Sequence, residues 1–410
     1  MHKLYKIISY FLIPLIKINT FIRILNKKED KIRYKERFGF TNLQKPLGKE
    51  LIWIHASSVG EFKSSDFLIN NFFNNYNILI TTTTKTAADY AITNYGDKII
   101  HQYAPYDVTF WINKFLDFWQ PKLVIWIESD LWPNTIVRLR ERKITSVFLN
   151  ARISPKSFNK WKYFSSYYKF ITKTFFAIYA QSQNDLNRIK SLTNNKVEYL
   201  GNLKLTNKLR ILPNSSTSKN INIMIASTHH NEEDLIIPYI KNISKKYPQI
   251  DFFIIPRHPE RSKMIFDLLR SKKLNVGLHS KITNNKFQFL IIDSFGKMDE
   301  FYDKSDIVIL GGSFTNNGGH NPIEAAVANC AIITGPHIFN WQNLYEDMIK
   351  KNCCLMIKNS KELEHNIINL IEDKSLISEL KQNALSFSES VFFDEDKLLS
   401  VINSKLENNA

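Results

Sequence analysis

The sequence predicts an α/β protein with two domains, each built around a parallel sheet that helices cover on both faces. Short apolar runs alternate with helix-length segments along most of the 410 residues, a pattern typical of buried parallel strands. A polar stretch, LPNSSTSKN at 212–220, interrupts the series and has the composition of a linker. The chain length also suits two domains of ordinary size.

Residues 1–30 are predicted to form a membrane-associated helix. The apolar segment IISYFLIPLI at 7–16 is flanked by lysines, and residues 1–50 carry half of the chain's net charge of +16. Ten helical residues reach about 15 Å, half of a bilayer core of about 30 Å. We therefore expect this helix to lie in the cytoplasmic leaflet with its lysines toward anionic headgroups. A core helix with a basic outer face and a cleaved signal peptide are the alternatives.

The first domain is expected over residues 31–212, followed by the linker at 213–220. Its predicted strands are LIWIH (51–55), ILIT (78–81), KLVIWIE (122–128), TSVFLN (145–150), FAIYAQ (176–181) and VEYLG (197–201). Its predicted helices begin near Val59, Thr86, Val108, Leu131, Pro155 and Asn184.

The second domain is expected over residues 221–385, with a C-terminal helix at 386–410 that packs back onto the first domain. Its predicted strands are INIMIAS (221–227), DFFIIP (251–256), FLIID (289–293), IVILGG (307–312) and AIITG (331–335). Ligands of open parallel sheets bind at the carboxyl ends of the strands. We therefore expect the active site in a central cleft that the two domains face.

Acidic residues follow two strands of the first domain. Glu61 lies just after the strand 51–55, at the start of a helix, where the helix dipole favours a carboxylate that can accept a proton. Its offset from Ser58 is also that of a capping box, so a purely structural role is the alternative. Glu128 and Asp130 end the strand 122–128, and two acids at one rim need a cation nearby. Lys204 is the candidate, with an ordinary solvated lysine as its alternative.

Glycines concentrate in the second domain. Six of the twelve lie between Gly296 and Gly335, so we expect the chain to wrap a ligand there, with ordinary turns as the alternative. A helix that begins near Asn321 would offer amides to a phosphate. Arg257, after the strand 251–256, has the fixed fork that suits a phosphate, and Glu324 can accept from ribose hydroxyls. This arrangement is typical of a nucleotide-sugar glycosyltransferase.

Cysteine and histidine patterns do not indicate a metal centre. Cys330, Cys353 and Cys354 have neither metal-binding spacing nor a disulfide framework, which indicates a reducing compartment. His229 and His230 are adjacent and lack a third ligand at suitable spacing. We therefore expect no metal ion and no other cofactor.

A series of motifs runs in order along the chain. The motifs are RYKERFGF (33–40), WIHASSVGEF (53–62), IESDLWPN (127–134), NARIS (150–154), GNLK (201–204), ASTH (226–229), PRHPER (256–261), GGSF (311–314), GGHNPIEAA (318–326) and GPHIFNW (335–341). Together they resemble the bacterial 3-deoxy-D-manno-octulosonic acid (Kdo) transferases. The resemblance implies a GT-B fold, CMP-Kdo as donor, a lipid A precursor (lipid IVA) as acceptor, inversion without a metal ion, and a place on the cytoplasmic side of the inner membrane in lipopolysaccharide synthesis.

By position, the resemblance implies that Glu61 is the catalytic base and that Glu128 and Lys204 stabilise the transition state. Asp130 stands where the family usually has a second glutamate, and its shorter reach puts a direct role in doubt. The implied CMP-Kdo contacts are Pro256, Arg257, Gly296, Lys297, Met298, Asn321, Pro322, Ile323 and Glu324. Further candidate site residues are Ser58, Asp130, Ser313, Gly319 and His320.

Two rival functions are consistent with parts of the sequence. A GT-B enzyme could use another nucleotide sugar, such as a UDP-sugar. A basic, non-catalytic protein could bind nucleic acid or membranes, but nucleic-acid binding requires basic residues spread along one face. Here the positive charge is concentrated near the N-terminus, so we expect a membrane surface and no nucleic acid as partner.

Overall fold

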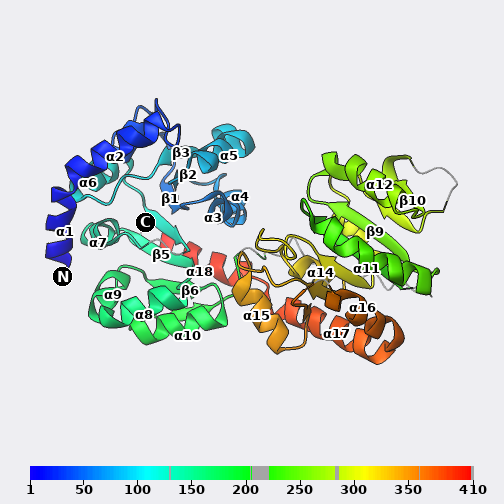
Figure 1. Ribbon diagram of the computed structural model, residues 1–410. Coiled ribbons are helices and arrows are strands. Elements are labelled where there is room, and N and C mark those ends of the chain that lie inside the picture. Colours follow the sequence, from blue (N-terminus) through cyan, green and yellow to red (C-terminus); the bar gives the residue numbers. More distant parts are fainter. Residues whose placement is uncertain (129–130, 204, 206–220, 282–285, 360, 408–410) are drawn as a thin grey trace. The chain divides into compact units, whose positions relative to one another are not determined.

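The computed structural model describes residues 1–128, 131–203, 205, 221–281, 286–359 and 361–407. The chain divides into two compact units, one made of residues 1–206 and 392–410 and the other of residues 207–391. In each unit, strands are flanked by helices on both sides (Figure 1). The two-domain α/β fold with parallel sheets is therefore confirmed.

The described part of the first unit holds a seven-stranded parallel sheet. In sheet order the strands are β3 (Ile100–Tyr103), β2 (Asn77–Thr82), β1 (Leu51–His55), β4 (Leu123–Ile127), β5 (Thr145–Ala151), β6 (Ala177–Ala180) and β7 (Val197–Tyr199). The helices are α1 (His2–Phe11), α2 (Ile13–Leu25), α3 (Val59–Lys63), α4 (Asp66–Phe72), α5 (Lys85–Tyr95), α6 (Thr109–Trp119), α7 (Pro133–Glu141), α8 (Pro155–Tyr163), α9 (Ser165–Thr172), α10 (Gln183–Leu192) and α18 (Glu395–Glu407).

Both faces of this sheet are buried, as its continuous apolar strands predict. Along β1, Ile52 and Ile54 belong to one core cluster, whereas Leu51 and Trp53 belong to the cluster on the opposite face. Helix α18 contributes Leu398, Ile402 and Leu406 to the first of these clusters. The last helix of the chain thus completes the core of the first unit. The predicted start of this segment, residue 386, falls inside α17, which continues to Val391.

The second unit also holds a seven-stranded parallel sheet within its described residues. In sheet order the strands are β10 (Val276–Leu278), β11 (Phe289–Ile291), β9 (Asp251–Pro256), β8 (Asn222–Thr228), β12 (Ile307–Leu310), β13 (Ala331–Thr334) and β14 (Leu355–Met356). The helices are α11 (Glu232–Lys246), α12 (Ser262–Ser271), α13 (Met298–Asp303), α14 (Ile323–Val327), α15 (Gln342–Lys350), α16 (Lys361–Glu372) and α17 (Lys374–Val391).

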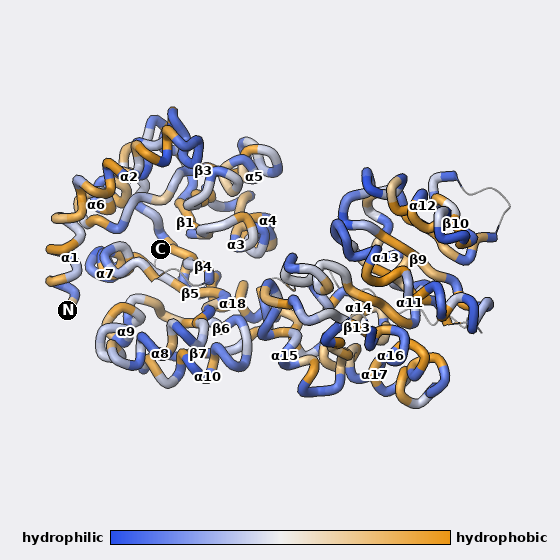
Figure 2. Tube along the Cα trace, viewed as in Figure 1, coloured by the Kyte–Doolittle hydropathy of each residue, from blue (hydrophilic) through white to orange (hydrophobic). Residues whose placement is uncertain are grey.

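The N-terminal segment forms two helices where the sequence predicted one. Pro14 lies in the first turn of α2, and a proline inside a longer helix would lack an N–H and clash with the preceding turn. No single helix in the described ranges is long and apolar enough to cross a membrane. Helices α1 and α2 taken together have sufficient length and apolar composition, with a bend of 55° between them. Figure 2 shows hydrophobic residues along both helices.

Candidate active site

The carboxylate of Glu61 is held at the carboxyl end of β1. Helix α3 begins after Ser58, whose hydroxyl accepts from the backbone N–H of Glu61 at 3.4 Å. In return, the backbone N–H of Ser57 donates to Oε2 of Glu61 at 2.6 Å, and Glu61 is only 8% exposed. The capping contact and a fixed carboxylate therefore occur together in this one turn.

His55 lies directly before this turn and is fully buried. Its Nδ1 is 2.9 Å from the hydroxyl of Thr81, and its Nε2 is 3.2 Å from the hydroxyl of Ser57. Burial, with a smaller contribution from Arg37, lowers the pKa of His55 to about 3. The imidazole is therefore neutral at physiological pH and connects the sheet to the Glu61 turn.

Glu128 follows β4 and is also buried. Its backbone adopts a left-handed conformation with φ of +65°, which is uncommon for residues other than glycine. The side-chain amide of Asn150 donates to Oε1 of Glu128 at 3.3 Å, and Oδ1 of Asn150 accepts from the backbone N–H of Leu203 at 3.2 Å. The predicted partners Asp130 and Lys204 lie outside the described residues.

Glu61 and Glu128 follow neighbouring strands. β1 pairs with β4 in parallel, with His55 opposite Trp126, and it pairs with β2 on its other side. The strand order reverses between β1 and β4, and such reversal points are where open α/β sheets bind ligands at their carboxyl edge. The fold thus brings two of the three predicted catalytic residues to the expected edge.

In the second unit, the predicted donor contacts come from three neighbouring loops. Arg257 follows Pro256 at the end of β9 and is exposed, while Gly296, with φ of +76°, and Lys297 precede α13. Burial and the nearby carboxylate of Asp299 raise the pKa of Glu324, and Asn321 and Arg257 act in the opposite direction. The carboxylate of Glu324 therefore interacts electrostatically with Asp299 and Arg257 and accepts a hydrogen bond from Asn321.

Asn321 caps the turn that precedes α14. Its Oδ1 accepts from the backbone N–H of Ile323 at 3.1 Å. Pro322 lies between them and is buried, and Met298 opens α13. The donor roles predicted for these residues remain predictions.

The glycine-rich loop after β12 wraps a carboxylate of the protein itself. Glu232, fully buried at the start of α11, accepts from the backbone N–H groups of Gly312, Phe314 and Thr315 at 2.7, 2.9 and 3.3 Å. It also accepts from the backbone N–H of His229 at 2.8 Å. The sequence predicted that this loop wraps a bound ligand. The N–H groups of Gly312, Phe314 and Thr315 instead donate to the protein's own Glu232.

The remaining candidates border this loop. The hydroxyl of Ser313 donates to the carbonyl of Leu310 and accepts from the N–H of Gly335, so it serves the loop's own structure. Gly319 donates its N–H to the carbonyl of Gly312 at 2.8 Å. Both residues thus stabilise the shape of the loop, and their role in the site stays a prediction.

His229 and His320 form a pair that the sequence analysis did not connect. Their Nε2 atoms are 3.0 Å apart, and the rings stack with centroids 5.1 Å apart. Burial, followed by His229 and Arg257, lowers the pKa of His320 to about 4, and burial also lowers the pKa of His229. Both histidines lie in predicted motifs, ASTH and GGHNPIEAA, but nothing in the local sequence indicates a pairing across 91 positions.

Known proteins resemble this chain over nearly its whole length. The family described as 3-deoxy-D-manno-octulosonic-acid transferase (kdotransferase) matches residues 32–207. The 3-deoxy-D-manno-octulosonic acid transferase of Rickettsia bellii is 34% identical, covering 98% of this chain and 99% of its own. The enzyme of the same name from Haemophilus influenzae is 31% identical, covering 87% and 88%.

A solved structure extends the likeness to the fold. MurG from Acinetobacter baumannii superposes with a TM-score of 0.54 at 10% identity, covering 83% of this chain and 95% of that one. This likeness supports the GT-B fold and carries nothing about substrate. The sequence matches, together with two Rossmann-like units and paired acids at a strand-order reversal, show that the chain belongs to the 3-deoxy-D-manno-octulosonic acid transferase family of glycosyltransferases.

Proposed function

We propose that this enzyme transfers Kdo from CMP-Kdo to a lipid A precursor in lipopolysaccharide synthesis, with inversion and with Glu61 as general base. The observation that supports the proposal most directly is the fixed carboxylate of Glu61 at the carboxyl end of β1, beside the strand that leads to Glu128. A general base must be held within hydrogen-bond reach of the proton that it removes.

In the proposed reaction, Glu61 takes the proton of an acceptor sugar hydroxyl as its oxygen attacks the anomeric carbon of Kdo. The bond from that carbon to the phosphate oxygen breaks, and CMP leaves with the bonding electron pair. Arg257 pairs with the phosphate, and Glu324 accepts from the ribose hydroxyls. Glu128 and Lys204 stabilise the positive charge and the developing leaving group around the transition state.

The N-terminal helices support a membrane-bound location on the cytoplasmic side of the inner membrane. Their buried residues are polar: Ser9 accepts from the side-chain amide of Asn134 at 3.1 Å, and Thr20 lies 2.9 Å from the hydroxyl of Tyr106. The large apolar residues point outward, including Phe11 at 80% and Leu15 at 62% exposed. Exposed apolar surface of this extent marks a binding surface, and flanking lysines favour anionic lipid.

Product analysis tests the proposed function. Purified full-length enzyme is incubated with CMP-Kdo and a detergent-solubilised lipid A precursor, and the product is examined by mass spectrometry. We expect a mass increase of one or more Kdo units and release of CMP. No glycolipid product, together with tighter binding of UDP than of CMP in a titration, would replace the proposal with a UDP-sugar donor.

A further inference from the structure

A path of hydrogen bonds connects the segment after α2 with the Glu61 turn. Arg37 lies in the 3-10 helix Tyr34–Phe38, and its Nη2 donates to the carbonyl of Thr83 at 2.7 Å. Thr83 in turn donates twice to the carbonyl of Ser57, from its backbone N–H at 3.1 Å and from its hydroxyl at 2.7 Å. The N–H of Ser57 donates to Glu61 at 2.6 Å. The path therefore ends on the carboxylate.

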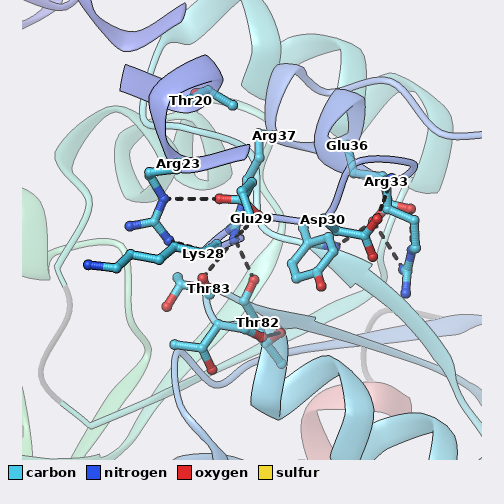
Figure 3. Close-up of polar contacts among 12 residues, drawn as sticks. Thr20, Arg23, Lys28, Glu29, Asp30, Arg33, Glu36, Arg37, Thr82 and Thr83 are labelled. Atoms are coloured by element: carbon cyan, nitrogen blue, oxygen red, sulfur yellow. Dashed lines mark hydrogen bonds and ion pairs between the residues drawn. The ribbon is translucent and has the colours of Figure 1, made fainter. Parts of the chain in front are cut away.

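Arg37 is itself held from several sides, as Figure 3 shows. It is 4% exposed, and its guanidinium pairs with the buried Glu29 at 3.2 Å and lies over the ring of Tyr103 at 4.6 Å. It also donates to the carbonyl of Thr82 at 3.3 Å. A buried charge is costly to leave unpaired, so this constellation gives Arg37 a single position against the end of β2.

We propose that Arg37 and Thr83 are positioning residues for catalysis, which act by fixing the backbone of Ser57, whose N–H orients the carboxylate of Glu61. The inference rests on the proposed role of Glu61 as base. The backbone of Ser57 is held on both sides of its Cα, since Thr83 donates to its carbonyl and its N–H donates to Glu61. Rotation about the backbone bonds of Ser57 would turn the N–H away from the carboxylate.

Arg33 provides a matched comparison within the same segment. It forms a two-fold ion pair with Glu36 at 2.8 and 3.0 Å (Figure 3). It also donates to the carbonyl of His101 at 2.6 Å. Like Arg37, it attaches the segment to the sheet, but its hydrogen bonds reach His101 of β3 and not Thr83. Loss of Arg33 should therefore weaken the fold without changing the backbone orientation of Ser57.

Kinetics on solubilised acceptor test the inference with the variants Thr83→Val, Thr83→Ser, Arg37→Lys and Arg33→Lys. Thr83→Val is nearly isosteric and removes the hydroxyl donor. We expect kcat to fall by about 10-fold in Thr83→Val and in Arg37→Lys, with KM for CMP-Kdo unchanged, because small displacements of a catalytic group slow the chemical step strongly. Thr83→Ser should restore most of kcat, and Arg33→Lys should leave it near the wild-type value.

The same substitutions in a Glu61→Gln background separate positioning from general destabilisation. If Thr83 acts through Glu61, Thr83→Val has little further effect once the carboxylate is gone. An equal fold loss in both backgrounds, or a full kcat in Thr83→Val, would overturn the positioning role. A Glu61→Gln enzyme with wild-type turnover would instead overturn the proposed base, so the two failures are distinguishable.

Discussion

The carboxylate of Glu232 lies 2.7 Å from the backbone nitrogen of Gly312, across 80 positions of sequence, and accepts its N–H. Together with the amides of Phe314 and Thr315, this contact shapes the loop that follows β12. Gly312 itself has φ of +68°, and a Cβ there would lie 3.0 Å from the ring of His320. The buried acid therefore organises the loop that leads from β12 to His320 and to the predicted donor contacts Asn321, Pro322, Ile323 and Glu324.

Glu232→Gln should destabilise the second unit and weaken CMP binding. The side-chain NH₂ group of a glutamine would face backbone N–H groups that are themselves donors. Those buried N–H groups would lose their acceptor, which lowers the free energy of unfolding by about 1–3 kcal/mol. Urea unfolding and CMP titration measure the two effects. Glu389→Gln, at an exposed position on α17, serves as control and should change neither. A Glu232→Gln protein with wild-type stability would show that the loop holds its shape without the acid.

Glu61→Gln should retain CMP binding and lose turnover by about 10²–10⁴, the range for a positioned general base. Ser58→Ala is the matched control, because it removes the hydroxyl that accepts from the N–H of Glu61 and keeps the carboxylate. The cap loss should cost about 1 kcal/mol of stability and leave turnover largely intact. If Ser58→Ala lost as much turnover as Glu61→Gln, capping would be the main role of this turn.

Phe11→Glu combined with Leu15→Glu should release the enzyme from anionic vesicles while the protein stays folded. Both side chains are exposed, so the substitutions remove apolar insertion and add repulsion from the lipid surface. Vesicle sedimentation measures binding, and turnover on detergent-solubilised acceptor should persist. Leu47→Glu is the control, since Leu47 is 93% exposed and lies outside α1 and α2. Undiminished vesicle binding by the double variant would place the membrane contact elsewhere.

The stability of the first unit should fall as the pH drops below about 6.5, the ordinary pKa of histidine. Burial lowers the pKa of both His55 and His101 to about 3. Between these pH values the unfolded chain binds protons that the folded chain does not. Each histidine therefore lowers the free energy of unfolding by up to about 1.4 kcal/mol for each unit by which the pH decreases. Urea unfolding between pH 5 and 7.5 measures the slope. His101→Gln should flatten it, and the exposed His365→Gln should leave it unchanged.

Gly201→Ala should destabilise the contact between the end of the first sheet and the returning C-terminal segment. Gly201 has φ of +93°, and a Cβ would lie 2.0 Å from the carbonyl oxygen of Phe392. Gly48 has φ of +87° with no atom within 4 Å of such a Cβ. Gly48→Ala should therefore lower the free energy of unfolding only by the strain of a left-handed alanine, about 1–2 kcal/mol. Gly201→Ala should lower it by about 1–3 kcal/mol more, because the added methyl group overpacks the contact. Equal losses in unfolding experiments would contradict the close approach.

The layered fold and the strand ends that carry the acids could be predicted from the amino-acid sequence alone. LIWIH is β1 at the predicted residues, and α8 begins at Pro155 as predicted. Continuous apolar runs and helix starts are local signals, so they are readable without neighbours. The position of Glu61 after β1 followed from the same signals.

Short strands lacked such signals. β10 and β14 have three and two residues and lack the longer apolar run that made β7 and β11 predictable, and β3 also went unpredicted. The break between α1 and α2 was present in the sequence as Pro14, but the outward direction of their apolar residues reverses the usual rule for globular helices.

The contacts between distant polar groups become visible only in the folded units. Arg37 reaches Thr83 across 46 positions, His229 reaches His320 across 91, and Glu232 reaches the amides of Gly312 and Phe314. These contacts depend on the order in which the strands assemble and on the direction of each loop that leaves the sheet. The spacing of residues in the sequence predicts neither the strand order nor the loop directions. A hydrogen bond requires a distance and an angle, and the packing of the whole unit sets both.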